Sequence, residues 1–381
     1  MDVSTIASMI REAKQGASIC LWPDYDIKDI PFAVYDDEQV VYIDHPNPPE
    51  TRPEQLMAAT SVPINEIATA TIPAEVCKSE SDVLPLAYHE GFHVFQHHHF
   101  TPLDADMFTA MAFYPELDPE YRALCRLEEN ILRNTDDSID QKVGILGHLM
   151  TLRRTRLNAH PSLLAYERFL ERSEGTAFFV EQQARQALFE QEPILGQSGH
   201  GWARFYQVGA ALCHLLDATV SDWTTRIEQG ASPGDLMMPQ AQNDIDLVSL
   251  GYEDVLEQEQ NAVSAFRTEI AGQMAHLENT DVVRIQYDKT GQQYRAFNPS
   301  TLVSLGDGRI LHRTAFTLLI PDRGSITVKQ GPVIDHVSQG EIILPPCIVE
   351  LDQGTLHLQT DAVQIDLTGV THIGDCVYSL L

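Results

Sequence analysis

The segment His89-Glu90-Gly91-Phe92-His93 places two histidines four residues apart, with a glutamate directly after the first. If this segment is helical, His89 and His93 project from the same face and can bind one metal ion. Zinc is the usual metal for two imidazoles at this spacing, and Glu90 can take a proton from a zinc-activated water molecule. The motif therefore predicts hydrolysis with Glu90 as the general base.

A catalytic zinc site needs a third protein ligand, and the sequence offers two candidates. Glu174 lies in a strongly helical stretch, where a buried glutamate needs a partner or a metal. His99 follows His89 by ten residues, which is the spacing of the metzincin pattern HExxHxxGxxH. That pattern uses a glycine to turn the chain sharply, but Gln96 stands at this position. We expect Glu174 to be the third ligand and keep His99 as the alternative.

The segment Ser173-Glu174-Gly175-Thr176-Ala177 resembles the EGxA segment of the gluzincin metallopeptidases, which also carry HExxH. The resemblance covers roughly residues 67–217. It implies a zinc metallopeptidase in which Glu174 is the third ligand, on a second helix downstream of the motif. It also implies an oxyanion donor on a later element, for which Tyr206 is the best candidate. The small residues Gly175 and Ala177 would let two helices approach closely around a metal.

Several further groups could support such a site. Arg204 and His200 are close to Tyr206 in the sequence and could project toward one region. Metal-bound histidines usually donate their second N–H to a carboxylate or carbonyl. Glu181 and Glu171 share the expected helix face of the third ligand, and we expect Glu171 to face solvent.

The pattern along the chain predicts three regions. A short N-terminal helix precedes extended segments, with a β-hairpin formed by Phe32–Tyr35 and Val40–Ile43. The strand expected at Ile67–Ile72 could pair with an extended substrate backbone. The middle of the chain is helical, and its expected helices lie at about residues 79–99, 119–133, 139–157, 161–191, 202–229 and 252–277. Residues 230–243 read as a loop, and short β-type runs separated by turn residues follow residue 279.

These regions predict an α+β fold with two domains. We expect residues 1–280 to form a mainly helical, zincin-like metallohydrolase domain. Its N-terminal helix and β-region occupy residues 1–75, and its helical zinc-binding part occupies residues 76–280. Residues 281–381 form a small all-β domain, which could recognise substrate or mediate a homo-oligomer.

The charge balance argues against several classes of partner. The chain has 55 acidic and 25 basic residues, and a formal net charge of -30. Nucleic acid or an anionic membrane surface would require a basic face, yet the densest basic run is Arg153-Arg154-Thr155-Arg156. The first residues lack the continuous apolar stretch of a signal peptide, and the 6 cysteines contain no CxxC pair. We expect a cytoplasmic protein without nucleic-acid or membrane partners.

We expect the chain to be a zinc-dependent hydrolase, and specifically a metallopeptidase that cleaves a peptide or protein substrate. Two alternatives are open. The first is a non-catalytic zinc-stabilised binding or regulatory protein, and the second is a zinc hydrolase of non-peptide amides or esters. Glu90 favours catalysis, because purely structural zinc sites are usually closed by four protein ligands. The ligand set suits several divalent metals besides zinc.

Overall fold

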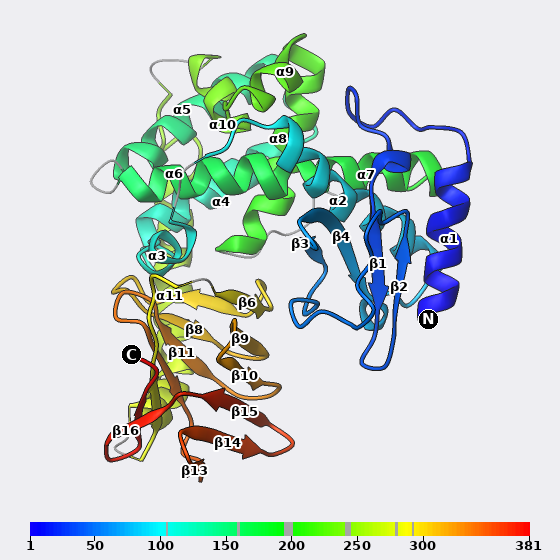
Figure 1. The fold of residues 1–381 in the computed structure, drawn as a ribbon. Helices are drawn as coiled ribbons and strands as arrows, with labels where there is room; N and C mark the ends of the chain where they lie inside the picture. The colour runs from blue at the N-terminus through cyan, green and yellow to red at the C-terminus, as the bar shows by residue number, and fades with distance from the viewer. Residues whose placement is uncertain (104–105, 158–160, 194–200, 241–244, 279–280, 292) are drawn as a thin grey trace.

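The computed structural model describes the whole chain except residues 104–105, 158–160, 194–200, 241–244, 279–280 and 292. A small N-terminal β region, a helical region and a C-terminal β region follow one another along the chain (Figure 1). This mixed α and β composition, with helices before the C-terminal strands, agrees with the prediction. Among the residues described, none of the helices combines the length and the apolar character that a membrane span requires.

The N-terminal region joins one helix to a four-stranded sheet with the order β2-β1-β4-β3. Its elements are α1 (Val3–Gln15), η1 (Ile27–Asp29), β1 (Phe32–Tyr35), β2 (Val40–Ile43), β3 (Thr60–Ile64), β4 (Ile67–Pro73) and η2 (Ala74–Val76). Strands β1 and β2 pair antiparallel, which confirms the predicted hairpin. Because side chains alternate across a strand, Phe32 and Val34 pack in the core that contains α1, whereas Ala33 and Tyr35 pack on the opposite face.

The interior position of β4 corrects one prediction. Strand β4 pairs parallel with β1 and antiparallel with β3, so both of its hydrogen-bonding edges are occupied. The proposal that Ile67–Ile72 pairs with a substrate backbone is therefore wrong. Strand β3 lies at the edge of the sheet instead. The sequence pattern predicts that a strand forms, but it does not specify the order of the strands.

The helical region follows the predicted order with four differences, the first of which is a short helix at Met107–Ala112 that was not predicted. Its elements are α2 (Glu80–His99), α3 (Met107–Ala112), α4 (Pro119–Arg133), α5 (Ile139–Leu157), α6 (Pro161–Leu170), η3 (Glu171–Gly175), α7 (Thr176–Phe189), α8 (Trp202–Thr219), α9 (Trp223–Glu228), α10 (Pro233–Met237), η4 (Met238–Gln240) and α11 (Tyr252–Leu277). The helix expected at 161–191 contains a π-helical turn, η3, between α6 and α7. The helix expected at 202–229 is interrupted, because Asp222 starts α9 as its N-cap. The loop expected at 230–243 contains α10, which Ser232 caps through the backbone N–H of Asp235.

The C-terminal region is a sandwich of two sheets. Its strands are β5 (Val283–Gln286), β6 (Tyr294–Phe297), β7 (Leu302–Ser304), β8 (Ile310–His312), β9 (Phe316–Ile320), β10 (Gly324–Val328), β11 (Val333–His336), β12 (Glu341–Leu344), β13 (Glu350–Asp352), β14 (Thr355–Gln359), β15 (Val363–Thr368), β16 (Thr371–Gly374) and β17 (Val377–Ser379). One sheet has the order β13-β14-β15-β10-β9-β6, and the other has the order β16-β17-β5-β12-β11-β8-β7. Apolar side chains from both sheets share one core.

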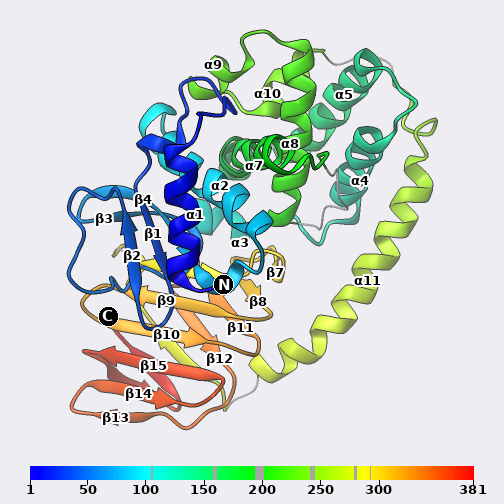
Figure 2. The same ribbon diagram turned by 90° about the vertical axis from the view of Figure 1, so that its right-hand side faces the viewer.

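Helix α11 connects the helical and C-terminal regions. It packs beside α4 along one part of its length and reaches the C-terminal sheets with the other (Figure 2). The outer face of the seven-stranded sheet, represented by Ile334 and Ile343, shares an apolar cluster with the C-terminal half of this helix. The helix contributes Phe266, Ile270, Met274 and Leu277 to that cluster. The boundary expected near residue 280 thus follows a helix that contacts both regions.

Candidate metal centre

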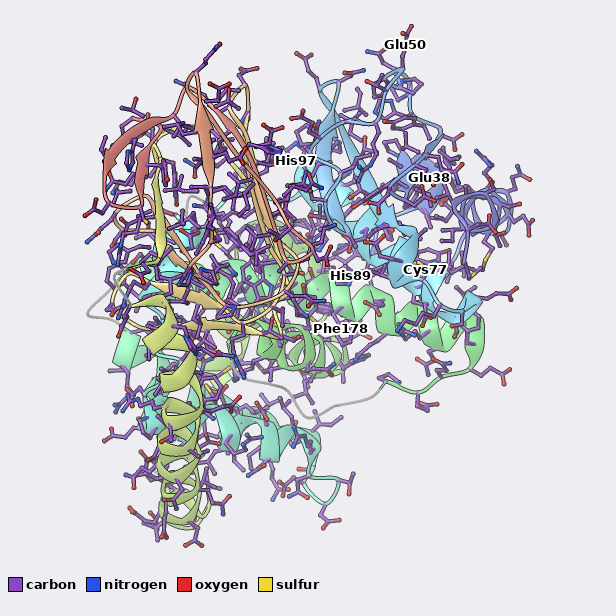
Figure 3. The ribbon with its side chains drawn as sticks, turned by 90° about the horizontal axis from the view of Figure 1, so that it is seen from below. Glu38, Glu50, Cys77, His89, His97 and Phe178 are labelled. Atoms are coloured by element: carbon purple, nitrogen blue, oxygen red, sulfur yellow. The ribbon has the colours of Figure 1, made fainter. Side chains whose placement is uncertain are left out.

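Helix α2 positions the two histidines of the HExxH motif. His89 is buried and His93 is partly buried, and their neighbours in the helix, Phe92 and Val94, belong to the hydrophobic core. The Nε2 atoms of His89 and His93 face each other at 3.2 Å. Figure 3 shows His89 near the middle of the molecule, whereas Glu50 lies at its periphery. The two imidazoles therefore project from one face of a helix, as predicted.

The π-helical turn η3 positions Glu174 opposite α2. A π-helical turn inserts an extra residue into a helix and re-aims the side chains that follow. Gly175 ends this turn against α8, where a Cβ atom on Gly175 would lie 2.8 Å from the Cα of Gly209. The absence of side chains at both glycines lets α8 approach the turn closely. This close approach was predicted from the small residues of the segment.

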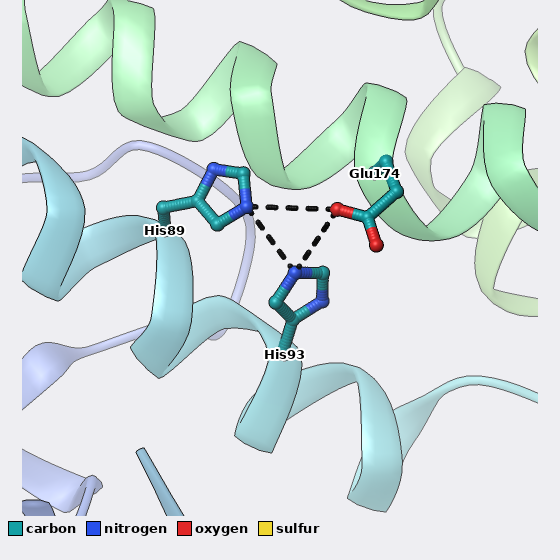
Figure 4. Close-up of side chains that lie close together, drawn as sticks. All are labelled: His89, His93 and Glu174. Atoms are coloured by element: carbon teal, nitrogen blue, oxygen red, sulfur yellow. Dashed lines mark hydrogen bonds and ion pairs between the residues drawn. The ribbon is translucent and has the colours of Figure 1, made fainter. Parts of the chain in front are cut away.

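The three candidate ligands form one compact group (Figure 4). Glu174 Oε2 lies 3.7 Å from His89 Nε2 and 3.4 Å from His93 Nε2. A tetrahedral metal with ligands at about 2.0–2.1 Å separates its ligand atoms by roughly 3.3–3.4 Å. Glu174 Oε2 is buried and has no hydrogen-bond partner among the described residues. The geometry and this oxygen without a hydrogen bond both fit a zinc ion bound by His89, His93 and Glu174.

His99, the alternative third ligand, lies away from this group. Its side chain is exposed, and its ring stacks on Phe95 with the ring centroids 4.1 Å apart. It lines a separate cavity together with Asp24 and Asp26. The metzincin arrangement would require the chain to turn back after His93, but α2 continues without interruption to His99.

Polar side chains contact the Nδ1 atom of each histidine, which is the ring nitrogen that does not face the other two candidate ligands. His89 Nδ1 lies 3.0 Å from Glu181 Oε2, and Arg185 Nη2 donates to Glu181 Oε1 at 2.9 Å. His93 Nδ1 lies 2.8 Å from Gln96 Oε1. A carboxylate or carbonyl oxygen behind a histidine is typical of metal ligands. Sequence reasoning named Glu181 for such a role but missed Gln96.

Glu171 does not face solvent as expected. Its side chain is 1% exposed, and Oε2 accepts hydrogen bonds from Arg154 Nη2, Ser232 Oγ and the backbone N–H of Gly234. These partners come from α5 and from the start of α10, which are distant in the sequence. Glu171 thus joins the π-helical turn to two other helices, and the prediction of an exposed charge was wrong.

The charges of the site shift one another's pKa. Burial alone would raise the pKa of Glu174, but His93 and His89 hold it well below its usual range. Burial likewise opposes protonation of His89, yet contacts with Glu174 and Glu181 raise its pKa to about 10. Burial raises the pKa of Glu90, and this effect outweighs the opposing charges of both histidines. A raised pKa suits a carboxylate that must accept a proton near neutral pH.

Helix α8 brings Tyr206 to the same place. Its ring stacks on His89 with a centroid distance of 5.9 Å, and it makes an edge contact with Phe178. Burial and the neighbouring charges of Glu174 and Glu90 raise the pKa of Tyr206 well above its usual value. The hydroxyl therefore stays protonated and able to donate a hydrogen bond. Its role as an oxyanion donor remains a prediction.

Of the two other polar residues proposed near Tyr206, Arg204 does not join the site. Arg204 is buried and pairs with Glu128 and Glu129, on the side of α8 that faces α4. It belongs to a buried network of ion pairs that also includes Arg153 and Glu167. His200 lies outside the described residues.

A cavity of about 550 Å³ opens beside the candidate ligands. His93 and Glu174 form part of its wall, and Thr60 and Ser61 of edge strand β3 form another part. Much of the remaining lining is apolar, and it includes Phe100, Leu103, Met107, Phe108, Phe169 and Trp202. The cavity thus combines a candidate metal site, a strand edge and an apolar surface.

The C-terminal β region supports one wall of this cavity. Phe297 on β6 packs edge to face against both Phe108 and Trp202, at centroid distances of 6.4 and 5.5 Å. Arg295 on the same strand stacks over the Phe108 ring at 4.4 Å. Strand β6 therefore holds two lining residues in place from outside the cavity.

Comparisons of this chain with protein-family models, with curated proteins and with solved structures found no match.

Proposed function

We propose that this protein is a zinc-dependent hydrolase of the gluzincin type, and specifically a metallopeptidase. The observation that carries the proposal is the convergence of His89, His93 and Glu174 on one point, with Glu90 directly beside the first ligand. Three protein ligands leave one coordination position open for water or substrate, as catalytic zinc sites require.

The chain's own residues have separate roles in this proposal. His89, His93 and Glu174 hold zinc, which supplies Lewis acidity and makes water acidic enough to lose a proton near neutral pH. Glu90 accepts that proton and later passes it to the leaving amine. Tyr206 donates its hydroxyl proton to the oxygen on which negative charge develops. Burial around Glu90 strengthens each of these electrostatic interactions.

The surroundings of the site favour a peptide substrate over a small amide or ester. Strand β3 lies at the edge of its sheet, and its residues Thr60 and Ser61 border the same cavity as His93 and Glu174. An extended peptide can add to such an edge through backbone hydrogen bonds. The apolar part of the cavity, around Phe108 and Trp202, suits a large apolar side chain of that peptide.

Replacement of Glu90 by glutamine tests the function directly. We expect Glu90→Gln to retain zinc but to lose peptide hydrolysis by at least about a hundredfold, because glutamine cannot accept the proton. Glu80→Gln, on an exposed residue in the first turn of the same helix, is the matched control and should keep wild-type activity. The substrate would be a peptide library, with products identified by mass spectrometry.

Two outcomes of this experiment would refute the proposal. A wild-type protein that holds zinc but cleaves no peptide in the library would point to one of the alternatives named above. Cleavage that persists unchanged in Glu90→Gln would show that another group or a contaminant performs the reaction.

A further inference from the structure

Gln96 is a buried side chain that contacts both of the elements carrying candidate metal ligands. It lies on α2, three residues after His93, and is 8% exposed. Its amide reaches across to the π-helical turn η3 and to the first residue of α7, 76 to 80 residues further along the chain.

The surroundings of Gln96 fix the orientation of its amide group. Nε2 lies 2.9 Å from the carbonyl oxygen of Ser173 and 2.8 Å from Thr176 Oγ1, with the carbonyl oxygen of Arg172 at 3.4 Å. The Thr176 hydroxyl itself donates to the Arg172 carbonyl at 2.6 Å, so it presents a lone pair to Gln96. Carbonyl oxygens only accept hydrogen bonds. A reversed amide would place oxygen against oxygen, so the NH2 group must face the turn.

This orientation determines which nitrogen of His93 is free. With its NH2 group directed at the turn, Gln96 presents Oε1 to His93 Nδ1 at 2.8 Å. An amide oxygen can only accept, so Nδ1 must carry the proton and donate it. A neutral imidazole with Nδ1 protonated keeps its lone pair on Nε2. Nε2 is the atom that lies 3.4 Å from Glu174 Oε2, on the side of the candidate metal.

We propose that Gln96 is a positioning residue that couples the two halves of the metal centre. One end of its amide selects the metal-binding tautomer of His93, and the other end holds the turn that carries Glu174. This inference rests on the metal centre of the proposed function, but it does not depend on peptide hydrolysis. It predicts that Gln96 controls metal affinity and coordination geometry without touching the metal.

The test compares two buried glutamines that each bond a histidine. Gln96→Met keeps the length and volume of the side chain but removes both hydrogen-bonding ends. Gln182→Met is the matched control, because Gln182 is 3% exposed and its Oε1 lies 3.0 Å from Nε2 of His214. Zinc affinity is measured by competition with a chromophoric chelator, and coordination is measured by the visible absorption of the cobalt(II)-substituted protein. Thermal unfolding of the metal-free variants reports their folding.

The expected results separate positioning from general stability. Both variants should unfold at a lower temperature than wild type when metal-free. Of these two variants, Gln96→Met alone should weaken zinc binding, by roughly 10–100-fold, and alter the cobalt spectrum. Thr176→Val removes a hydroxyl that contacts Gln96 but no ligand, and it should weaken zinc binding to a smaller degree.

Three other outcomes are informative. If Gln96→Met binds zinc as tightly as wild type with an unchanged cobalt spectrum, the positioning role is refuted while the proposed function stands. If wild type binds zinc but hydrolyses no peptide, the function fails and the affinity comparison still decides the role of Gln96. If wild type takes up neither zinc nor cobalt, both proposals are overturned.

Discussion

Gly175 and Gly209 lie backbone against backbone where the π-helical turn crosses α8. A Cβ atom on Gly175 would lie 2.8 Å from the Cα of Gly209, and one on Gly209 would lie 2.5 Å from the Cα of Gly175. Real Cβ atoms do not approach other atoms so closely, so neither position accepts a larger residue without movement of the backbone. This contact sets the distance between the turn that carries Glu174 and the helix that carries Tyr206.

We therefore expect Gly175→Ala to damage both stability and the metal centre. Overpacking of this kind typically costs about 1–3 kcal/mol, and displacement of the turn would weaken zinc binding as well. Gly272→Ala in α11 is the control, because a Cβ atom there meets nothing within 4 Å. It should stabilise the protein by about 0.5–1 kcal/mol through helix propensity. Urea unfolding measures the stability of both variants, and zinc titrations measure their metal affinity. A Gly175→Ala protein as stable as wild type would contradict this account.

Metal content should distinguish Glu174 from His99. Wild type should hold about one zinc per chain, as a single three-ligand site requires. Glu174→Ala should lose most of this zinc, because it removes an oxygen that faces both histidines. His99→Ala should keep it, because that ring is exposed and stacks on Phe95. Elemental analysis of untagged protein measures all three, and loss of zinc from His99→Ala alone would restore the metzincin alternative.

Tyr206→Phe should lower kcat and leave KM almost unchanged. The hydroxyl is expected to act on charge that develops only in the transition state, and removal of one such donor typically costs about 10²–10³-fold in kcat. Tyr42→Phe is a suitable control, because the Tyr42 hydroxyl has no hydrogen-bond partner among the described residues. Steady-state kinetics on a fluorogenic peptide would measure kcat and KM for both variants. A rise in KM at constant kcat would mean that Tyr206 binds substrate instead.

Glu116 should make stability depend on pH at the junction with the C-terminal region. Burial raises its pKa from the ordinary 4.5 to about 7, although Oε2 accepts a 2.8 Å hydrogen bond from the backbone N–H of Ser304. Between pH 4.5 and 7 the folded state holds a proton that the unfolded chain releases, so stability falls as pH rises through this window. The loss is on the order of 3 kcal/mol and is complete above pH 7.

The Glu116→Gln variant isolates that contribution. Glutamine cannot titrate, so the free energy of unfolding of wild type relative to the variant should decrease from pH 4.5 to pH 7 and then level off. Denaturant unfolding at several pH values gives this difference directly. A difference that is flat with pH would show that Glu116 titrates alike in the folded and unfolded chains.

The candidate ligands could be chosen from the sequence because their chemistry is encoded locally. His89 and His93 need only a helix to share a face, and a helix follows from the apolar pattern around them. Glu174 was preferred to His99 because a buried glutamate needs a partner and because Gln96 stands where the metzincin pattern needs a glycine. Gly175, which follows Glu174, does form a close helix contact. Such short-range signals depend little on the rest of the fold.

The errors concern contacts between distant segments. Glu171 was expected in solvent because its partners, Arg154 and Ser232, come from other helices. In the sequence, Gln96 was interpreted only as a residue that disfavours a sharp turn. Its partners on η3 are mostly backbone carbonyl oxygens. A pattern of side chains in the sequence does not reveal such partners. The π-helical turn itself also has no clear sequence signature. These features appear only when the packing of α2, η3 and α8 is known.

The packing of α11 limits how this protein can be divided for experiments. A chain truncated near residue 280 would keep the helix but lose the sheet that covers its apolar face. Phe266, Ile270, Met274 and Leu277 would then be exposed to water. The cavity wall would also lose the support that Phe297 gives to Trp202. Such a fragment would aggregate through the uncovered helix face, so recombinant production and assays require both the helical region and the C-terminal β region.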